Sequence, residues 1–275
     1  MVTKREKQKM RKLDFQYHMR LLFPEPVNRH HFTLRCFPID SERQKITNLN
    51  IQITPLHVGG TEMDSFGNRC IYGVVEKSHT EFCVSVDGMA YVYGDAFQPV
   101  TDAHKIGMFR YNTDLTKIGP TLDKLYKKLS AGTPEKEAIT EKALRWMEGV
   151  HSSIKYVQGI TQVTTTAEEA AVFGMGVCQD YAHIFLALLR KEHIPSRYVV
   201  GMMTGEGASH AWVEVCDGGK WVGFDPTNNC MVDDQYICIS HGRDARDCTI
   251  NQGYFYGSPR QIQEINVVVE ESRDD

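Results

Sequence analysis

The chain has 275 residues and a formal net charge of −4. Hydrophobic residues make up 41% and charged residues 24%, which predicts one or two globular domains and excludes a fibrous or largely disordered chain. The acidic balance argues against a general nucleic-acid partner.

The N-terminal segment is basic, with lysines and arginines gathered over residues 4–12. We expect a solvated terminus there rather than a functional arm. The segment lacks the apolar stretch of a secretory signal, and no run of about eighteen apolar residues occurs in the chain. The sequence therefore predicts a cytoplasmic protein with no membrane partner.

The eight cysteines are expected to be reduced in that compartment, and most fit the role of small buried hydrophobes. No CxxC pair occurs, so a thioredoxin-like redox motif is excluded. Cys230, Cys238, His241 and Cys248 do not have the spacing of a zinc site. A calcium-loop signature is also missing, so we expect neither a metal nor another cofactor.

The first hundred residues predict β-strands. Apolar residues alternate with polar ones from Phe15 to Phe23. Further strands are expected over residues 32–36, 49–53, 69–75, 80–86 and 89–93. Asp87-Gly88 between the last two is a strong hairpin signal. Short strands with regular turns favour an antiparallel β-sandwich, and residues 13–100 are predicted as this domain.

The second predicted domain, residues 101–270, consists of helices followed by a sheet, which makes the fold class α+β. Apolar residues recur with helical period over 115–129 and 134–150, and Thr133-Pro134-Glu135 has the composition of a helix start. Another helix is expected to begin at Thr166-Ala167-Glu168-Glu169. The boundary between the domains is expected within residues 95–112.

Cys178 lies where a glycine-rich stretch meets an apolar helix. The stretch runs from Gly174 to Val177, and the helical stripe that follows ends at Ile194-Pro195. Backbone N–H groups and the helix dipole at a helix N-terminus favour a thiolate and can receive an oxyanion. The position alone is weak evidence for a nucleophile, because a cysteine beside an apolar helix is more often a packing residue.

A predicted hairpin places a histidine beside an aspartate. Strands are expected over 197–203, 210–216 and 220–224, with a glycine-rich loop at 204–209. A turn at Asp217-Gly218 pairs His210 directly with Asp225, and a turn at Gly218-Gly219 shifts the register by two but keeps both on one face. A structural ion pair explains these two residues equally well. Combined with a helix-terminal cysteine, they favour a Cys-His-Asp triad.

Three segments of this region resemble the core motifs of the bacterial transglutaminase-like superfamily: GVCQDYAH at 176–183, ASHAWVEV at 208–215 and GFDPTNN at 223–229. Residues 156–168 and 242–244 are similar to the flanking segments of that family, and the strand-rich start is similar to a β-sandwich that often precedes it. The resemblance implies a papain-like α+β core with Cys178 as nucleophile, His210 as acid and base, and Asp225 as orienting acid. It further implies a thioester acyl-enzyme formed from a protein or peptide amide.

Several neighbouring residues receive secondary roles. Tyr156 is a candidate oxyanion donor, with core packing as its plainer role. Trp212 and Trp221 are expected to pack beside the site, and an aromatic wall over an acyl tunnel is the alternative. His183 is expected to be a packed or capping histidine. Asn228 is expected to end its strand by forming a turn.

The triad defines the first half-reaction and leaves three readings of the protein. With water as acceptor it is a protease or amidase, which the superfamily resemblance favours. With an amine as acceptor it is a transglutaminase that uses glutamine as acyl donor. The third reading is a peptide-binding module that keeps the fold without turnover. The sequence assigns no oligomeric state.

Overall fold

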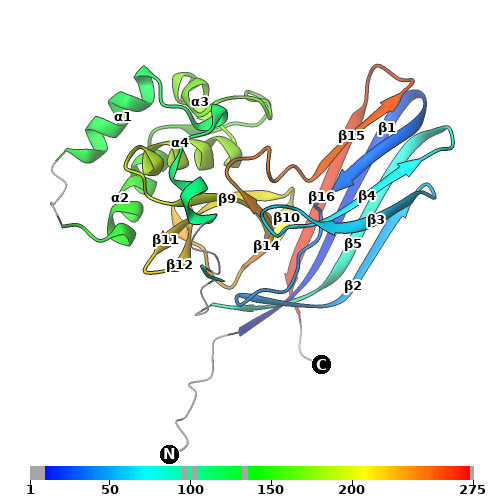
Figure 1. Ribbon diagram of the computed structural model, residues 1–275, viewed down its shortest axis with the longest axis horizontal. Coiled ribbons are helices and arrows are strands. Elements are labelled where there is room, and N and C mark those ends of the chain that lie inside the picture. The colour runs from blue at the N-terminus through cyan, green and yellow to red at the C-terminus, as the bar shows by residue number, and fades with distance from the viewer. Residues whose placement is uncertain (1–9, 95–97, 101–104, 132–135, 273–275) are drawn as a thin grey trace, which may run out of the picture.

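The computed structural model describes residues 10–94, 98–100, 105–131 and 136–272. A curled sheet of long strands lies beside a smaller sheet that is covered by helices (Figure 1). The α+β fold class predicted from the sequence is confirmed. Within these ranges, no helix combines the length and the apolar character needed to cross a membrane.

The large sheet combines strands from both ends of the chain, and all its pairings are antiparallel. Its members are β1 (Met10–Leu34), β2 (Gln44–Thr54), β3 (Val58–Met63), β4 (Arg69–Val75), β5 (His79–Tyr93), β10 (Gly205–Gly207), β15 (Asn251–Tyr256) and β16 (Ile262–Glu271).

Strand β1 contributes to both halves of this sheet. Its inward side chains alternate from Phe15 to Phe23 as predicted, and the alternation extends back to Leu13; each of these is at most 4% exposed. The first half of β1 pairs with β5 and β16, and the second half pairs with β4 and β15. Irregularities in register separate the two halves, so the sheet curls around one apolar core.

The C-terminal strands belong to the large sheet, which corrects the predicted division of the chain. β16 pairs with β1 from Leu13↔Glu271 to Leu22↔Ile262, and its Val267 and Val269 are buried in the core of that sheet. The sequence had placed residues up to 270 in the second domain. A strand's local pattern shows that one face is buried but not which sheet buries it, so the assignment depended on tertiary pairing.

The predicted hairpin at Asp87-Gly88 is wrong. β5 runs unbroken through these residues, which pair with Gln16 and Phe15 of β1. A Cβ at position 88 would lie 2.9 Å from Cζ of Phe15, so this glycine makes room for an aromatic ring. Glycine inside a strand commonly marks such a close approach, and Gly88 has this role instead of forming a turn.

The smaller sheet has the order β13-β12-β11-β9-β14, with β6 beside β12. The strands are β6 (Gln98–Pro99), β9 (Ser196–Met203), β11 (His210–Asp217), β12 (Lys220–Asp225), β13 (Cys230–Met231) and β14 (Tyr236–Gly242). Strands β9, β11 and β12 confirm the three predicted from the sequence. The predicted loop at 204–209 contains β10, which pairs with β16 and so links the two sheets.

The helices pack on the smaller sheet (Figure 1). They are α1 (Pro120–Ser130), α2 (Ile139–His151), α3 (Ala167–Phe173) and α4 (Cys178–Lys191), with 3-10 turns η1 (Lys105–Arg110) and η2 (Asp114–Thr116) and a short parallel pair, β7 (Lys155–Tyr156) and β8 (Met175–Gly176). The predicted helix start at Thr133-Pro134-Glu135 lies outside the described residues. Thr166 and Glu169 cap α3 reciprocally, as its predicted start requires.

Helix α1 begins at Pro120, later than its apolar period predicted, and Glu168 of α3 caps it. The Glu168 carboxylate accepts hydrogen bonds from the backbone N–H groups of Gly119 (3.1 Å), Thr121 (2.7 Å) and Leu122 (3.0 Å). Burial favours the neutral acid, but these bonds outweigh it and lower the pKa of Glu168. The carboxylate thus supplies acceptors for amides that have none inside the helix.

Helix α4 is the centre of the second core. Every side chain from Asp180 to Arg190 is buried. Strands β9 and β11 pack against one side of α4, and the other helices cover the rest. This enclosure fixes the position of the helix N-terminus, where Cys178 lies.

Candidate active site

Cys178 is the first residue of α4, as predicted, and its thiol is half-buried. The turn before it is fixed by Asp180, whose Oδ2 accepts hydrogen bonds from the Val177 N–H and the Thr161 hydroxyl, both at 2.7 Å. A Cβ at Gly176 would lie 2.6 Å from the Asp180 side chain, so glycine is sterically required there. The first amides of α4 have no intrahelical acceptor and point toward this end of the helix.

His210 and Asp225 meet through the second of the two predicted registers. Asp217 pairs with Lys220, so the turn is Gly218-Gly219. Both glycines have positive φ, +56° and +78°, as a two-residue hairpin turn of this type requires. His210 and Asp225 are therefore offset by two positions on the same face, and His210 Nε2 lies 2.7 Å from Asp225 Oδ2.

The Asp225 carboxylate is fully buried and receives five hydrogen bonds. Its Oδ2 accepts from His210 Nε2 and Asn228 Nδ2, both at 2.7 Å, and from the Tyr236 hydroxyl at 2.9 Å. Its Oδ1 accepts from the backbone N–H groups of Thr227 (2.9 Å) and Asn228 (3.1 Å). Burial favours the neutral acid, but the hydrogen bond and charge of His210 outweigh it and lower the pKa of Asp225. The carboxylate is therefore ionised at neutral pH.

The His210 ring lies between this carboxylate and the thiol. Burial disfavours the imidazolium, but hydrogen bonds to Asp225 and Cys178, together with their charges, outweigh burial and raise the pKa of His210 to about 10. Nε2 is engaged by Asp225, so Nδ1 is the ring nitrogen left to face Cys178. Trp212 stacks on the ring, with centroids 6.5 Å apart and an interplanar angle of 27°. A histidine that faces a thiol and is held by a carboxylate is the arrangement that a cysteine nucleophile requires.

Cys178 and His210 line a cleft of about 480 Å³. Strands β9 and β11 supply buried apolar walls such as Val200, and the segment before α3 supplies exposed residues such as Thr164. Gln263 of β16 also lines the cleft, so the large sheet forms part of it. Asp225 lies behind His210 and does not line the cleft.

The residues that were given secondary roles near the triad lie in different parts of the structure. Tyr156 lies on β7, its side chain is 50% exposed, and it is not among the residues that line the cleft, so its oxyanion role stays a prediction. Trp212 and Trp221 are buried in packing positions outside the cleft. His183 is fully buried, and its Nε2 accepts a hydrogen bond from the Ala245 N–H at 3.2 Å, as expected of a packed histidine.

Sequence reasoning missed two of the residues that hold Asp225. Asn228 was assigned only a turn, yet it donates through both its side chain and its backbone. An Asx-type turn at Asp225 would have indicated the backbone contact, because Asp side chains commonly accept from amides two or three residues on. Tyr236 has no such signal, since it arrives from β14, and only the tertiary fold places its hydroxyl on the carboxylate.

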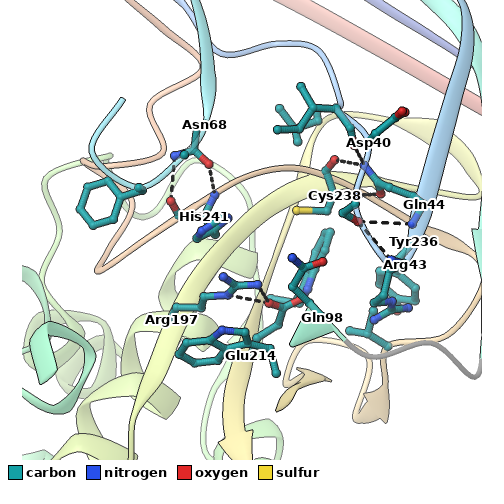
Figure 2. Close-up of a pocket in the computed structure, with 18 of the residues that line it drawn as sticks. Asp40, Arg43, Gln44, Asn68, Gln98, Arg197, Glu214, Tyr236, Cys238 and His241 are labelled. Carbon is teal, nitrogen blue, oxygen red and sulfur yellow. Dashed lines mark hydrogen bonds and ion pairs between the residues drawn. The ribbon is translucent and has the colours of Figure 1, made fainter. Parts of the chain in front are cut away.

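A second cavity, of about 240 Å³, lies between the loops of the large sheet and the smaller sheet, and Tyr236 lines it. Figure 2 shows the side-chain amides of Gln44 and Asn68 hydrogen-bonded to the backbone of β14. Gln44 accepts from the N–H and donates to the C=O of Cys238, both at 2.8 Å, and Asn68 binds the N–H (2.9 Å) and C=O (2.8 Å) of His241. The two amides replace a neighbouring strand at this sheet edge and so hold the strand that carries Tyr236.

The fold and site define a papain-like α+β class of protein, and comparison with known families agrees. The family model described as the transglutaminase-like superfamily matches residues 124–226, and the model described as the bacterial transglutaminase-like N-terminal region matches residues 13–90. The uncharacterized protein ML0607 of Mycobacterium leprae is 34% identical over 274 residues, which covers 92% of this chain and 95% of that protein. The uncharacterized protein Rv2569c of Mycobacterium tuberculosis is 27% identical over 84% of each chain. This chain belongs to the transglutaminase-like superfamily, a cysteine-based catalytic family.

A solved structure shares the whole fold. A candidate cysteine protease from Cytophaga hutchinsonii superposes with a TM-score of 0.80, covering 97% of this chain and 92% of that one. Its sequence identity to this chain is 21%, so the similarity establishes the fold and not the activity.

Proposed function

We propose that this protein is a cysteine-dependent amide hydrolase that acts on protein or peptide substrates. The observation that carries the proposal is the placement of Cys178, His210 and Asp225: His210 is hydrogen-bonded to the buried Asp225, and Cys178 and His210 line the same cleft. A nucleophile, a proton carrier and an orienting carboxylate in contact are the parts that acyl transfer requires.

Each group has one task in the proposed cycle. The Cys178 thiolate attacks the amide carbonyl carbon, and the first amides of α4 stabilise the oxyanion. The His210 imidazolium then donates its proton to the departing amine, which leaves a thioester on Cys178 and a neutral imidazole. His210 next takes a proton from water, hydroxide attacks the thioester, and collapse releases the acid with the thiolate and imidazolium restored. Asp225 keeps Nε2 occupied, so Nδ1 exchanges the proton throughout.

Access of water to the thioester supports hydrolysis over amine transfer. The Cys178 thiol is half-buried, and the cleft rim includes exposed residues such as Val163 and Thr164. Water can therefore reach the acyl group at its bulk concentration, and an amine has to compete with it.

Mass spectrometry after incubation of a mixed protein substrate with a tagged primary amine tests the proposal. Wild type is compared with Cys178→Ala and with Cys83→Ala, a matched control in a half-buried cysteine of β5. We expect new peptide termini without tag in wild type and Cys83→Ala, and none in Cys178→Ala. Tag on glutamine side chains would assign the transglutaminase reaction instead. If neither product forms, the remaining reading is a binding module without turnover.

Alkylation supplies a test that needs no substrate. Burial and the Glu81 carboxylate raise the pKa of Cys83 to about 11, and burial raises the pKa of Cys230, so both thiols stay protonated near pH 6. We expect iodoacetamide to modify Cys178 well before these two, because His210 stabilises its thiolate. Equal rates for the three cysteines near pH 6 would contradict the proposed thiolate–imidazolium pair.

A further inference from the structure

Arg246 gives the cleft a positive charge that nothing in the proposed cycle uses. It lies in the segment between β14 and β15, is exposed, and lines the same cleft as Cys178 and His210. Among the described residues that line this cleft there is no aspartate or glutamate. His210 is the other basic lining residue, and Asp225 already neutralises it. The cleft therefore presents to a substrate one cation that is not paired with a carboxylate.

The surroundings of Arg246 leave its guanidinium available. Arg243, three residues earlier, pairs with Asp247 at 2.8 Å. Within the part of the chain that the structure describes, Arg246 forms no ion pair, and its charge acts on the Asp114 carboxylate only at longer range. The backbone of Arg246 is anchored, since its N–H donates to Asp244 Oδ1 at 2.8 Å and its C=O accepts from the Thr249 hydroxyl at 3.0 Å. The base of the side chain is thus fixed beside the cleft, and its charged end is unpaired.

A second unpaired group lies in the same cleft. Asn251 lines it, and the Asn251 Oδ1 is a buried acceptor with no hydrogen-bond partner among the described residues. Leaving a buried acceptor unpaired is costly, and because this oxygen is itself covered, a ligand N–H reaches it once the Asn251 side chain turns toward the cleft. A peptide that carries a carboxylate offers both groups that are missing here: an amide N–H for Asn251 and an anion for Arg246.

We infer that Arg246 selects substrates with a carboxylate close to the scissile amide; this rests on the proposed amide hydrolysis. A guanidinium binds a carboxylate through two parallel N–H···O bonds, which fixes orientation as well as charge. The carboxylate can belong to an aspartate or glutamate side chain or to a peptide C-terminus. No aspartate or glutamate among the described lining residues repels either.

The test uses peptides around a bond that the purified full chain cleaves in a Cys178-dependent way. Each acidic residue within two positions of that bond is compared with its amide, Glu with Gln, and each peptide is made with a free and an amidated C-terminus. For wild type we expect kcat/KM to be about tenfold higher for the acidic peptide, and the preference to shrink as salt rises from about 0.05 to about 0.5 M. The position that carries the preference distinguishes a side-chain carboxylate from a terminal one.

Substitutions then test whether Arg246 causes the preference for acidic peptides. Arg246→Gln should bring the Glu-to-Gln ratio close to one, and Arg246→Glu should invert it. Arg260→Gln removes an exposed arginine that does not line the cleft, and it should keep the wild-type ratio. Thermal unfolding of each variant checks that the fold is retained. A wild-type ratio of one, or a preference that survives in Arg246→Gln, would overturn the inference and leave the hydrolase intact. Absence of any Cys178-dependent cleavage would refute the proposed function itself.

Discussion

Replacing Asp225 with asparagine preserves the shape of the side chain and removes the acceptor that holds His210. The two backbone N–H groups of residues 227 and 228 keep an oxygen at the Oδ1 position. The new NH₂ group then faces three donors, from His210, Asn228 and Tyr236. Asn228 is exposed and can turn to water, so His210 and Tyr236 lose a buried partner.

The magnitude follows from these two buried donors. Each unsatisfied buried group costs about 1–3 kcal/mol, and removal of one member of a buried ion pair costs about 3–5 kcal/mol. We therefore expect Asp225→Asn to lower the free energy of unfolding by about 2–5 kcal/mol near pH 6. Loss of the fixed ring orientation should lower kcat/KM by about 100- to 10,000-fold.

The direction in which the stability difference between wild type and Asp225→Asn changes with pH follows from the two pKa shifts. The folded pKa of His210 is raised from 6.5 to about 10, so its contribution to stability is complete below pH 6.5 and is lost as pH rises toward about 10. The pKa of Asp225 is lowered from 3.8, so its contribution is present above pH 3.8 and is lost at more acid pH. The difference between wild type and Asp225→Asn should therefore be largest between these limits and should shrink on the alkaline side.

Urea unfolding at pH 6 and pH 10 measures this difference, and the rate of Cys178 alkylation near pH 6 reports the thiolate. Asp14→Asn, an exposed change on β1, is the control for loss of one carboxylate. We expect the control to match wild type in both measurements. The reasoning would be refuted by an Asp225→Asn protein that unfolds and alkylates like wild type, or by a stability difference that grows as pH rises.

Three further changes test the contacts around the site. Tyr236→Phe removes one hydrogen bond to Asp225 and should cost about 0.5–1.5 kcal/mol in urea unfolding, and an unchanged stability would mean that the hydroxyl contributes nothing. Glu168→Gln weakens the cap of α1 and should cost about 0.5–2 kcal/mol at pH 7. Because the pKa of Glu168 is lowered, this cost should be complete above its ordinary value of 4.5, shrink in thermal unfolding as pH falls below 4.5, and vanish below the lowered folded pKa, and a cost that is unchanged at the most acid pH would refute the capping role. Gln44→Ala leaves the backbone of Cys238 without its side-chain partner and should speed hydrogen exchange of that amide, while exchange in α4 stays as in wild type.

Local sequence determined which segments form strands and helices, and that His210 and Asp225 lie on the same face of their hairpin. The alternation from Phe15 to Phe23 fixed the inward face of β1, because a strand's side chains alternate with a period of two. The apolar stripe after Cys178 fixed a buried helix that starts at that cysteine. His210 and Asp225 share a face in either hairpin register, so their proximity followed from counting residues, although the register itself depended on the glycine turn.

Tertiary structure alone decided which elements surround that site. Tyr236 reaches Asp225 from β14, Gln263 reaches the cleft from β16, and Glu168 caps α1 from another helix. Arg246 carried no motif, and only the fold showed that it lines the cleft beside Cys178. Periodicity reports that a face is buried, and short motifs report backbone geometry, but neither reports which distant segment does the burying. That choice is made by packing and hydrogen bonding between segments up to hundreds of residues apart, and the free energy of the whole fold decides it.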